Sequence, residues 1–267
     1  MDLKALLDRH FIKKPAVRRF VTRLIEGDRD REVSLFGATL KVNSIREHGY
    51  LRASRTAAWS SVFGDEAAVL MSLASLLPRI DTIVDAGANV GLFSATLGRF
   101  QKLFPGLKIF AFEADPDTFS RLQGNLSAPD QTAFHFAAGD RPGKLTFVRG
   151  AVSHVTTTVS QANAYSLGET FEVECRRLDS FEIPGRNLLL KIDVEGQELD
   201  VLRGASRWFD EGRCAVVYLD GFEKRGEVFE LLRGHDFMLL DGRTLEPAGE
   251  ETFSLLAIRR EWFDSFP

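Results

Sequence analysis

The sequence has few features that would support disulfide bonding, membrane crossing or a secretory route. Its 267 residues include two cysteines, Cys175 and Cys214, each within an apolar, strand-like run. A thiol in such surroundings behaves as a small hydrophobic group, so we predict two reduced core residues. No run of about 18 uninterrupted apolar residues occurs, as a transmembrane helix would need, and no apolar stretch led by arginine or lysine opens the chain. We therefore expect a cytoplasmic protein without a transmembrane segment.

An excess of basic charge is also missing. The chain has 34 basic and 38 acidic residues, which give a formal net charge of -4. A nucleic-acid partner is disfavoured because nothing in this balance would neutralise a phosphate backbone. The 44% hydrophobic and 27% charged residues are ordinary globular values. Since no internal repeat or low-complexity tract is present, one catalytic domain is the default expectation.

The N-terminal 26 residues mix basic and apolar side chains. A basic cluster consists of Arg9, His10, Lys13, Lys14, Arg18, Arg19 and Arg23, and it is interleaved with Leu6, Leu7, Phe11, Ile12, Val17 and Phe20. Such a segment could rest on an anionic membrane. Asp2, Asp8 and Glu26 share it, however, so we favour an amphipathic helix with a solvated charged face. The same helix could also pack across the two-fold axis of a homodimer.

Strand-like and helix-like segments alternate after this point. Strand-like segments cover residues 82–85, 108–112, 133–137, 188–193 and 214–219, and helix-like segments cover 64–77, 92–103 and 197–208, with a further helix starting at Asp115-Pro116. This alternation predicts an α/β fold with a mostly parallel, doubly wound sheet. Residues 237–240 and 253–258 indicate an antiparallel C-terminal hairpin. We interpret residues 1–63 as an N-terminal helical and β extension, and 64–267 as the main domain with an insertion near 141–180.

The turn between the first strand and its helix reads Asp85-Ala-Gly87-Ala-Asn89-Val-Gly91. A dinucleotide fingerprint would read G-x-G-x-x-G, but Asn89 replaces the middle glycine and no third glycine follows, which disfavours a pyrophosphate ligand. S-adenosylmethionine has no phosphate, and its amino-acid end can be held by this loop and Asp85. Glu113, at the end of the next strand, can accept hydrogen bonds from both ribose hydroxyls, and Asp140 could accept a hydrogen bond from the adenine amino group. Without Glu113, a plain tight turn would be the better interpretation of the two glycines.

Four sequence blocks carry a family resemblance. They are Val84–Ser94 (VDAGANVGLFS), Ala111–Pro116 (AFEADP), Ala137–Asp140 (AAGD) and Leu190–Ala205 (LKIDVEGQELDVLRGA), the last being the most specific. With them the chain resembles the FkbM-like family of methyltransferases. The resemblance implies a Rossmann-like class I methyltransferase fold with a seven-stranded sheet, and S-adenosylmethionine-dependent methylation of hydroxyl groups. One departure is at the end of the fifth strand, where a glutamate is expected and Asp220 is found.

Methyl transfer needs an aligned acceptor oxygen and a group to take its proton. Asp193 and Glu195 follow the fourth strand, at the sheet edge where α/β proteins build their sites, so we predict that this pair faces the acceptor. Alternatively, Glu195 only stabilises the N-terminus of the following helix. Lys191 should share a sheet face with Asp193 and could pair with a carboxylate. His154, in the polar part of the insertion, is a third candidate base because histidine titrates near neutral pH, although a solvated loop histidine is commoner.

The acceptor itself is less defined. A small molecule or a glycan fits, and Arg46, Arg52, Arg55 and Trp59 could line its site or form a surface patch. We predict no resident metal, although Asp193 and Asp220 could share a hard cation in a metal-assisted variant. An NAD-dependent oxidoreductase is disfavoured because the third glycine and a Tyr-x-x-x-Lys pair are missing. A catalytically silent scaffold would predict a broken cofactor site, whereas Asp85, Gly87, Gly91 and Glu113 are in place.

Overall fold

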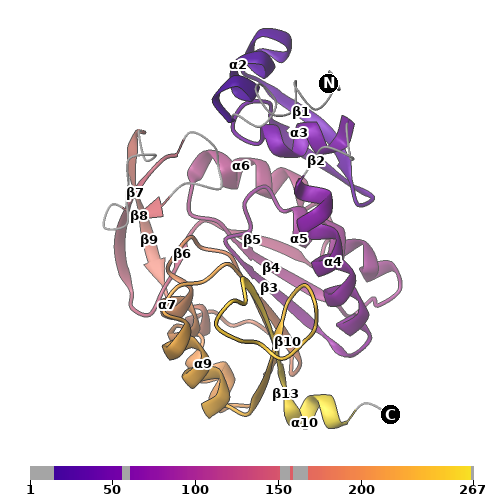
Figure 1. The fold of residues 1–267 in the computed structure, drawn as a ribbon, viewed down its shortest axis with the longest axis vertical. Helices are drawn as coiled ribbons and strands as arrows, with labels where there is room; N and C mark the ends of the chain where they lie inside the picture. Colours follow the sequence, from indigo (N-terminus) through magenta and orange to yellow (C-terminus); the bar gives the residue numbers. More distant parts are fainter. Residues whose placement is uncertain (1–14, 56–60, 151–156, 159–167, 266–267) are drawn as a thin grey trace, which may run out of the picture.

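The computed structural model describes residues 15–55, 61–150, 157–158 and 168–265 of the chain. A seven-stranded sheet lies at its centre (Figure 1). The strand order is β12-β13-β11-β10-β3-β4-β5, with bounds β3 (Thr82–Ala86), β4 (Lys108–Phe112), β5 (Gln131–Phe134), β10 (Leu188–Ile192), β11 (Cys214–Asp220), β12 (Phe237–Asp241) and β13 (Ser254–Arg259). The α/β class and the mostly parallel sheet are confirmed. Strand β13 inserts between β11 and β12 and pairs antiparallel with both, so the expected hairpin is present with β13 as the reversed strand.

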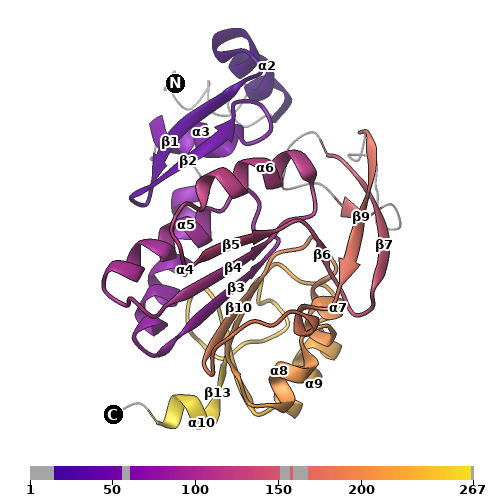
Figure 2. The same cartoon turned by 180° about the vertical axis from the view of Figure 1, so that it is seen from behind.

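Helices cover both faces of this sheet (Figure 2). Helices α4 (Ser61–Leu76), α5 (Leu92–Gly98), α6 (Pro116–Asn125) and α10 (Arg260–Asp264) lie on one face, and α7 (Glu198–Arg203), α8 (Ser206–Asp210) and α9 (Arg225–Gly234) lie on the other. Side chains alternate between the two faces along each strand. Ile83 accordingly packs with α4 and α5, whereas Val84 packs with α7 and α8. Among the described residues, no helix is both long and apolar enough to cross a bilayer.

Two predicted elements differ from the structure. The helix expected over 197–208 is divided into α7 and α8 at Gly204, where the backbone approaches another turn so closely that an added Cβ would lie 2.1 Å from the Gly139 carbonyl oxygen. The strand expected over 133–137 ends at Phe134. Ala137 and Ala138 instead form the short strand β6, which pairs with β9 in a second sheet.

This second sheet is built largely by the insertion. Its order is β6-β9-β7-β8, with β6 (Ala137–Ala138), β7 (Gly143–Val148), β8 (Thr157–Thr158) and β9 (Thr170–Arg176). It stands at the edge of the molecule, beside β5 and α6 (Figures 1 and 2). Cys175 lies in β9 and Cys214 in β11; both are buried free thiols, as predicted.

The N-terminal extension contains α2 (Pro15–Glu26), the hairpin β1 (Asp30–Leu35) and β2 (Ala38–Asn43), and α3 (His48–Arg55). Phe36 and Gly37 turn the hairpin with φ of 47° and 78°, the left-handed pair that suits a two-residue connection. The hairpin's buried side chains, including Leu40, pack against Val90 and against Leu122 of α6. The extension therefore supports the loop after β3. The boundary placed at residue 63 falls inside α4, and the division into two regions stays a prediction.

Candidate active site

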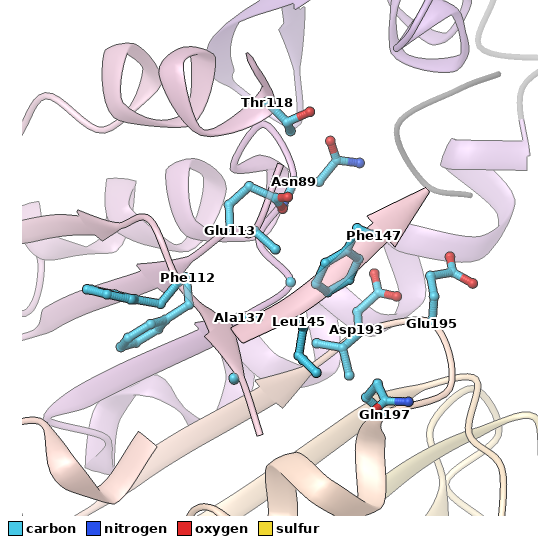
Figure 3. A pocket seen from close by; sticks show the side chains of 15 residues that line it. Asn89, Phe112, Glu113, Thr118, Ala137, Leu145, Phe147, Asp193, Glu195 and Gln197 are labelled. Carbon is cyan, nitrogen blue, oxygen red and sulfur yellow. The ribbon is translucent and has the colours of Figure 1, made fainter. Parts of the chain in front are cut away.

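A pocket that is partly open to solvent lies at the C-terminal edge of the central sheet (Figure 3). Its described lining comprises Gly87, Asn89, Phe112, Glu113, Ala114, Thr118, Phe136, Ala137, Ala138, Leu145, Phe147, Asp193, Val194, Glu195 and Gln197. Most of these residues follow β3, β4 and β10 or belong to the second sheet; Phe112 ends β4, Thr118 is in α6, and Phe136 precedes β6. The carboxyl edge of a parallel sheet is where α/β folds bind their ligands, so the position agrees with the expected site.

The loop after β3 needs backbone conformations that most residues avoid. Gly87 and Gly91 have φ of 77° and 87°, and Asn89, a residue that tolerates this region, has φ of 52°. The N–H groups of Gly87 and Ala88 both donate to the carbonyl oxygen of Phe112, at 3.0 and 2.9 Å. These bonds fix the loop to the end of β4.

Glu113 connects this loop to the next turn. Its Oε2 accepts the N–H of Asn89 at 2.8 Å, and its Oε1 accepts the N–H of Asp115 at 2.8 Å. Burial raises the pKa of Glu113 to about 7, against the lowering effect of these backbone hydrogen bonds. Two further lining atoms, Asn89 Oδ1 and Thr118 Oγ1, are buried and have no hydrogen-bond partner among the residues that the structure describes. The pocket therefore presents a carboxylate and two unpaired polar atoms to a ligand.

Beneath the loop lies a buried ion pair. Lys191 and Asp85 are register partners on adjacent strands, and Nζ lies 3.0 Å from Asp85 Oδ1. Ser94 Oγ donates to the other carboxylate oxygen at 2.7 Å. Burial lowers the pKa of Lys191, but the negative charges of Asp85 and Asp193 outweigh it, so the pKa lies above its ordinary value. Both Asp85 oxygens are thus engaged inside the protein. Lys191 pairs with a carboxylate, as predicted.

Asp193 and Glu195 lie together on one wall of the pocket (Figure 3). About a third of the Asp193 side chain is exposed (34%), and Glu195 is exposed with φ of 52°. Burial raises the pKa of Asp193 to about 6, with repulsion from Asp220 adding to it and Lys191 opposing it. Desolvation and the charge of Asp193 raise the pKa of Glu195 to about 8. Both carboxyl groups can therefore exchange protons near neutral pH.

The structure brings together five of the predicted site residues: Gly87, Asn89, Glu113, Asp193 and Glu195. Asp85 and Gly91 support the loop from below without lining the pocket. Asp140 also lies outside the lining, and its carboxylate pairs with Arg141 at 3.3 Å. Its expected contact with adenine stays a prediction. His154 and Trp59 lie outside the described residues.

Sequence reasoning missed the apolar part of the pocket. Phe112 and Phe136 line it from the central sheet and its edge, and Leu145 and Phe147 line it from β7. Leu145 and Phe147 are two residues apart on a strand, so they share one face. That alternation is visible in the sequence, but nothing local indicates that the insertion folds back over the loop.

Glu66 of α4 and Tyr50 of α3 were also missed. Burial raises the pKa of Glu66 to about 7, with the charge of Asp220 adding to it. Burial likewise raises the pKa of Tyr50, and the charges of Glu66 and Asp193 add to it. The extension and α4 thus approach the carboxylate side of the pocket. Glu66 and Tyr50 belong to no sequence motif whose spacing could have identified them as site residues.

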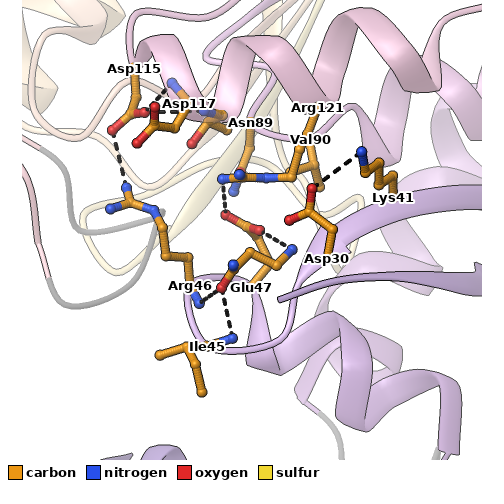
Figure 4. A network of polar contacts seen from close by, with 12 residues as sticks. Asp30, Lys41, Ile45, Arg46, Glu47, Asn89, Val90, Asp115, Asp117 and Arg121 are labelled. Atoms are coloured by element: carbon orange, nitrogen blue, oxygen red, sulfur yellow. Dashed lines mark hydrogen bonds and ion pairs between the residues drawn. The ribbon is translucent and has the colours of Figure 1, made fainter. Parts of the chain in front are cut away.

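The arginines expected near an acceptor are partly engaged elsewhere. Arg46 pairs with Asp115 at 3.1 Å, and the adjacent Glu47 pairs with Arg121 of α6 at 3.1 Å (Figure 4). Arg55 pairs with Glu26. Arg46 and Arg55 therefore fasten parts of the extension, and their role toward an acceptor stays a prediction.

Comparison with known proteins agrees with this geometry. The family model described as "Methyltransferase FkbM domain" matches residues 85–241, which include the loop, Glu113 and the Asp193–Glu195 turn. The chain belongs to the FkbM methyltransferase family. It is therefore a methyltransferase, and the predicted family and enzyme class are confirmed.

Three relatives illustrate the range of this family. The chain is 35% identical over 150 residues to "Methyltransferase 1" of Beauveria bassiana, covering 48% of this chain and 59% of that protein. It is 26% identical to the "Hexuronic acid methyltransferase AglP" of Haloferax volcanii, over 75% of this chain and 78% of the relative. It is 29% identical to the "31-O-demethyl-FK506 methyltransferase FkbM" of Streptomyces tacrolimicus, over 67% and 81%. The match to the first thus spans less than two thirds of that relative.

The end of β11 carries the departure noted in the sequence of this FkbM-family protein. Asp220 stands there, and Tyr218 donates its hydroxyl to Asp220 Oδ1 at 3.1 Å. Asp220 is close enough to raise the pKa of Asp193. Within the described ranges, no three His, Cys, Asp or Glu side chains gather as a metal-binding group.

Proposed function

We propose that this methyltransferase uses S-adenosylmethionine and transfers its methyl group to a hydroxyl of a small molecule or glycan. The observation that carries the proposal is the charge of the pocket. Glu113, Asp193 and Glu195 contribute three carboxyl groups, and its described lining includes no lysine or arginine. A cationic sulfonium with an uncharged sugar suits this wall, whereas a pyrophosphate would meet like charge.

The cofactor would be held by the loop and by Glu113. The Glu113 carboxylate stands at the end of β4, where it can accept hydrogen bonds from ribose hydroxyls while it also holds the loop through Asn89. Asn89 Oδ1 and Thr118 Oγ1 are buried and lack partners within the described part of the chain, and ligand hydroxyl or amino groups would satisfy them. The apolar side chains of Phe136 and Phe147 suit the faces of an aromatic base. When bound, the cofactor supplies an activated methyl group on a sulfonium.

Asp193 and Glu195 are the residues that we assign to the acceptor's proton. The protein must orient the acceptor oxygen and remove its proton, and a base works best when its pKa lies near the working pH. Asp193 is held by Lys191 beneath it, at 3.6 Å, whereas Glu195 is more exposed. Asp193 is therefore the better oriented of the two.

The names of two relatives support a broad chemical class for the acceptor. One relative is named for a hexuronic acid and another for 31-O-demethyl-FK506. The first name gives a sugar acid and the second an oxygen atom that lacks its methyl group, so a hydroxyl of a sugar or of a small molecule is the acceptor that we propose. A silent scaffold is less favoured because the carboxyl groups that the reaction needs line the pocket. The metal-assisted alternative has Asp193 and Asp220 and no third ligand among the described residues.

Substitution of Glu113 by alanine is expected to abolish cofactor binding. Titration calorimetry with S-adenosylhomocysteine should give micromolar binding for the wild type and at least about a hundredfold weaker binding for Glu113→Ala, because two charge-assisted hydrogen bonds and the loop anchor are lost. Glu172→Ala is the matched control, since Glu172 is an exposed glutamate of β9 that pairs with Lys144 on the surface. No binding by a folded wild type would contradict the proposal.

The pH dependence of methyl transfer should identify the base. A base acts in its deprotonated form, so kcat/KM should rise with pH through the pKa of that group. The rise should centre near pH 6 if Asp193 acts and near pH 8 if Glu195 acts. Radiolabelled methyl transfer to a panel of uncharged sugar glycosides and small alcohols would supply the rates. Asp193→Asn and Glu195→Gln provide the assignment: the variant of the true base loses the pH-dependent rise and still binds S-adenosylhomocysteine.

A further inference from the structure

Helix α2 exposes its apolar side. Phe20, Val21, Leu24 and Ile25 recur at the spacing that places them on one face of a helix, and 63%, 44%, 70% and 70% of their surfaces are exposed. An ordinary surface helix turns this stripe toward the core. The sequence predicted that arrangement, with the charged face in solvent. The structure has the opposite orientation.

The polar side of α2 holds the helix to the protein. Glu26 is buried, and its carboxylate accepts hydrogen bonds from Arg31 of β1 and Arg55 of α3. Arg23 pairs with Asp28 just beyond the helix. In both views α2 lies at the outer end of the extension, away from the central sheet (Figures 1 and 2). The apolar stripe therefore faces away from the body of the enzyme.

The charge of this region points to the partner. Residues 1–25 contain seven lysines and arginines and two acidic residues, in a chain whose net charge is -4. Arg19 and Arg23 are on α2 itself; Arg23 pairs with Asp28, and Glu26, the acidic residue of the helix, is neutralised by two arginines. A strongly basic segment with an outward apolar stripe is complementary to a surface that has anionic groups on the outside and apolar groups beneath them. Anionic phospholipid has this composition.

We propose that α2 lies on an anionic membrane surface, with Phe20, Leu24 and Ile25 inserted among the lipid headgroups. A second copy of the chain is a poorer occupant. A two-fold contact through α2 would bring Arg19 and Arg23 of one helix toward the same residues of the other, and like charges in contact oppose association. The lipid surface satisfies the stripe and the charge together. The helix would then hold the extension, and with it the enzyme, at the bilayer without crossing it.

Vesicle sedimentation with the full chain tests the proposal. The wild type is expected to sediment with vesicles of phosphatidylcholine and phosphatidylglycerol, to remain in solution with phosphatidylcholine alone, and to bind more weakly as salt is raised. Leu24→Ser/Ile25→Ser should bind at least about tenfold more weakly because two inserted side chains are lost. Met71→Ser/Leu103→Ser is the matched control: both residues are exposed, at 73% and 70%, and lie outside the extension.

Three results would overturn the proposal. One is equal binding of the α2 variant and the wild type, and another is binding that does not depend on the anionic lipid. The third is a protein that ignores vesicles but forms a dimer in sedimentation velocity, which Leu24→Ser/Ile25→Ser dissociates. Thermal unfolding, followed by circular dichroism, checks that a loss of vesicle binding is not caused by unfolding of the variant. The substituted side chains are already exposed, so both double variants should melt within about 2 °C of the wild type.

Discussion

Replacement of Lys191 by methionine is expected to destabilise this methyltransferase by about 3–5 kcal/mol, the usual cost of removing one partner from a buried ion pair. Lys191 and Asp85 are 3% and 1% exposed, and their charged atoms lie 3.0 Å apart between adjacent strands. Methionine has a similar length, so packing changes little. Asp85 would keep one hydrogen bond, from Ser94, but its charge would be buried without a counter-ion.

Urea unfolding followed by circular dichroism measures this loss. The double variant Asp85→Asn/Lys191→Met removes both charges and should recover most of the stability, because the cost comes from the unpaired charge rather than from the missing bond. Lys144→Met is the control, since Lys144 is an exposed lysine whose ion pair with Glu172 lies on the surface. A Lys191→Met variant within about 1 kcal/mol of the wild type would show that the pair is not required for folding.

The Lys191–Asp85 pair also illustrates what could be predicted from the sequence. Local chemistry was sufficient for the short-range features. Thr82–Ala86 is a buried strand, Asp115 caps α6 by accepting from the N–H groups of Asp117 and Thr118, and the loop glycines have positive φ. The sequence also indicated that Lys191 would pair with a carboxylate. It could not indicate which one, because the partner is set by strand order, and β10 pairs with β3 from more than a hundred residues away.

The parts of the site that were not predicted from the sequence also depend on contacts between segments that are distant in the chain. Glu113, Asp193 and Glu195 could be placed because they follow strands, and the ends of parallel strands meet at one edge of a sheet. Leu145 and Phe147 could not, since their contact with the pocket depends on how a second sheet is oriented against the first. The prediction for helix α2 was wrong for a different reason. The helical periodicity was correct, but the direction of the apolar face depends on the contacts of Glu26 with Arg31 of β1 and Arg55 of α3, which local sequence does not indicate.

The substitution Gly87→Ala is expected to destabilise the protein by at least about 3 kcal/mol and to abolish binding of S-adenosylhomocysteine. At this position an added Cβ would lie 1.8 Å from the carbonyl oxygen of Asp193, and φ is 77°. The left-handed conformation alone costs an L-residue about 1–2 kcal/mol. The overlap adds more because a backbone oxygen, unlike a side-chain end, cannot rotate away. Asp193 would therefore move, and its N–H bond to the Ala86 carbonyl, at 2.9 Å, would be strained.

Substitutions at two other glycines allow the effect of Gly87→Ala to be compared with smaller expected effects. Gly91 has φ of 87°, but its nearest contact would be Leu122 Cδ1 at 2.8 Å, the end of a flexible side chain. Gly91→Ala should cost mainly the backbone term, about 1–2 kcal/mol. Gly106 has nothing within 4 Å of an added Cβ, so Gly106→Ala should melt like the wild type. Thermal unfolding and calorimetry on the three variants should rank them in this order. An equal loss for Gly87→Ala and Gly91→Ala would mean that the close approach to Asp193 does not control the loop, because backbone conformation alone would then account for both.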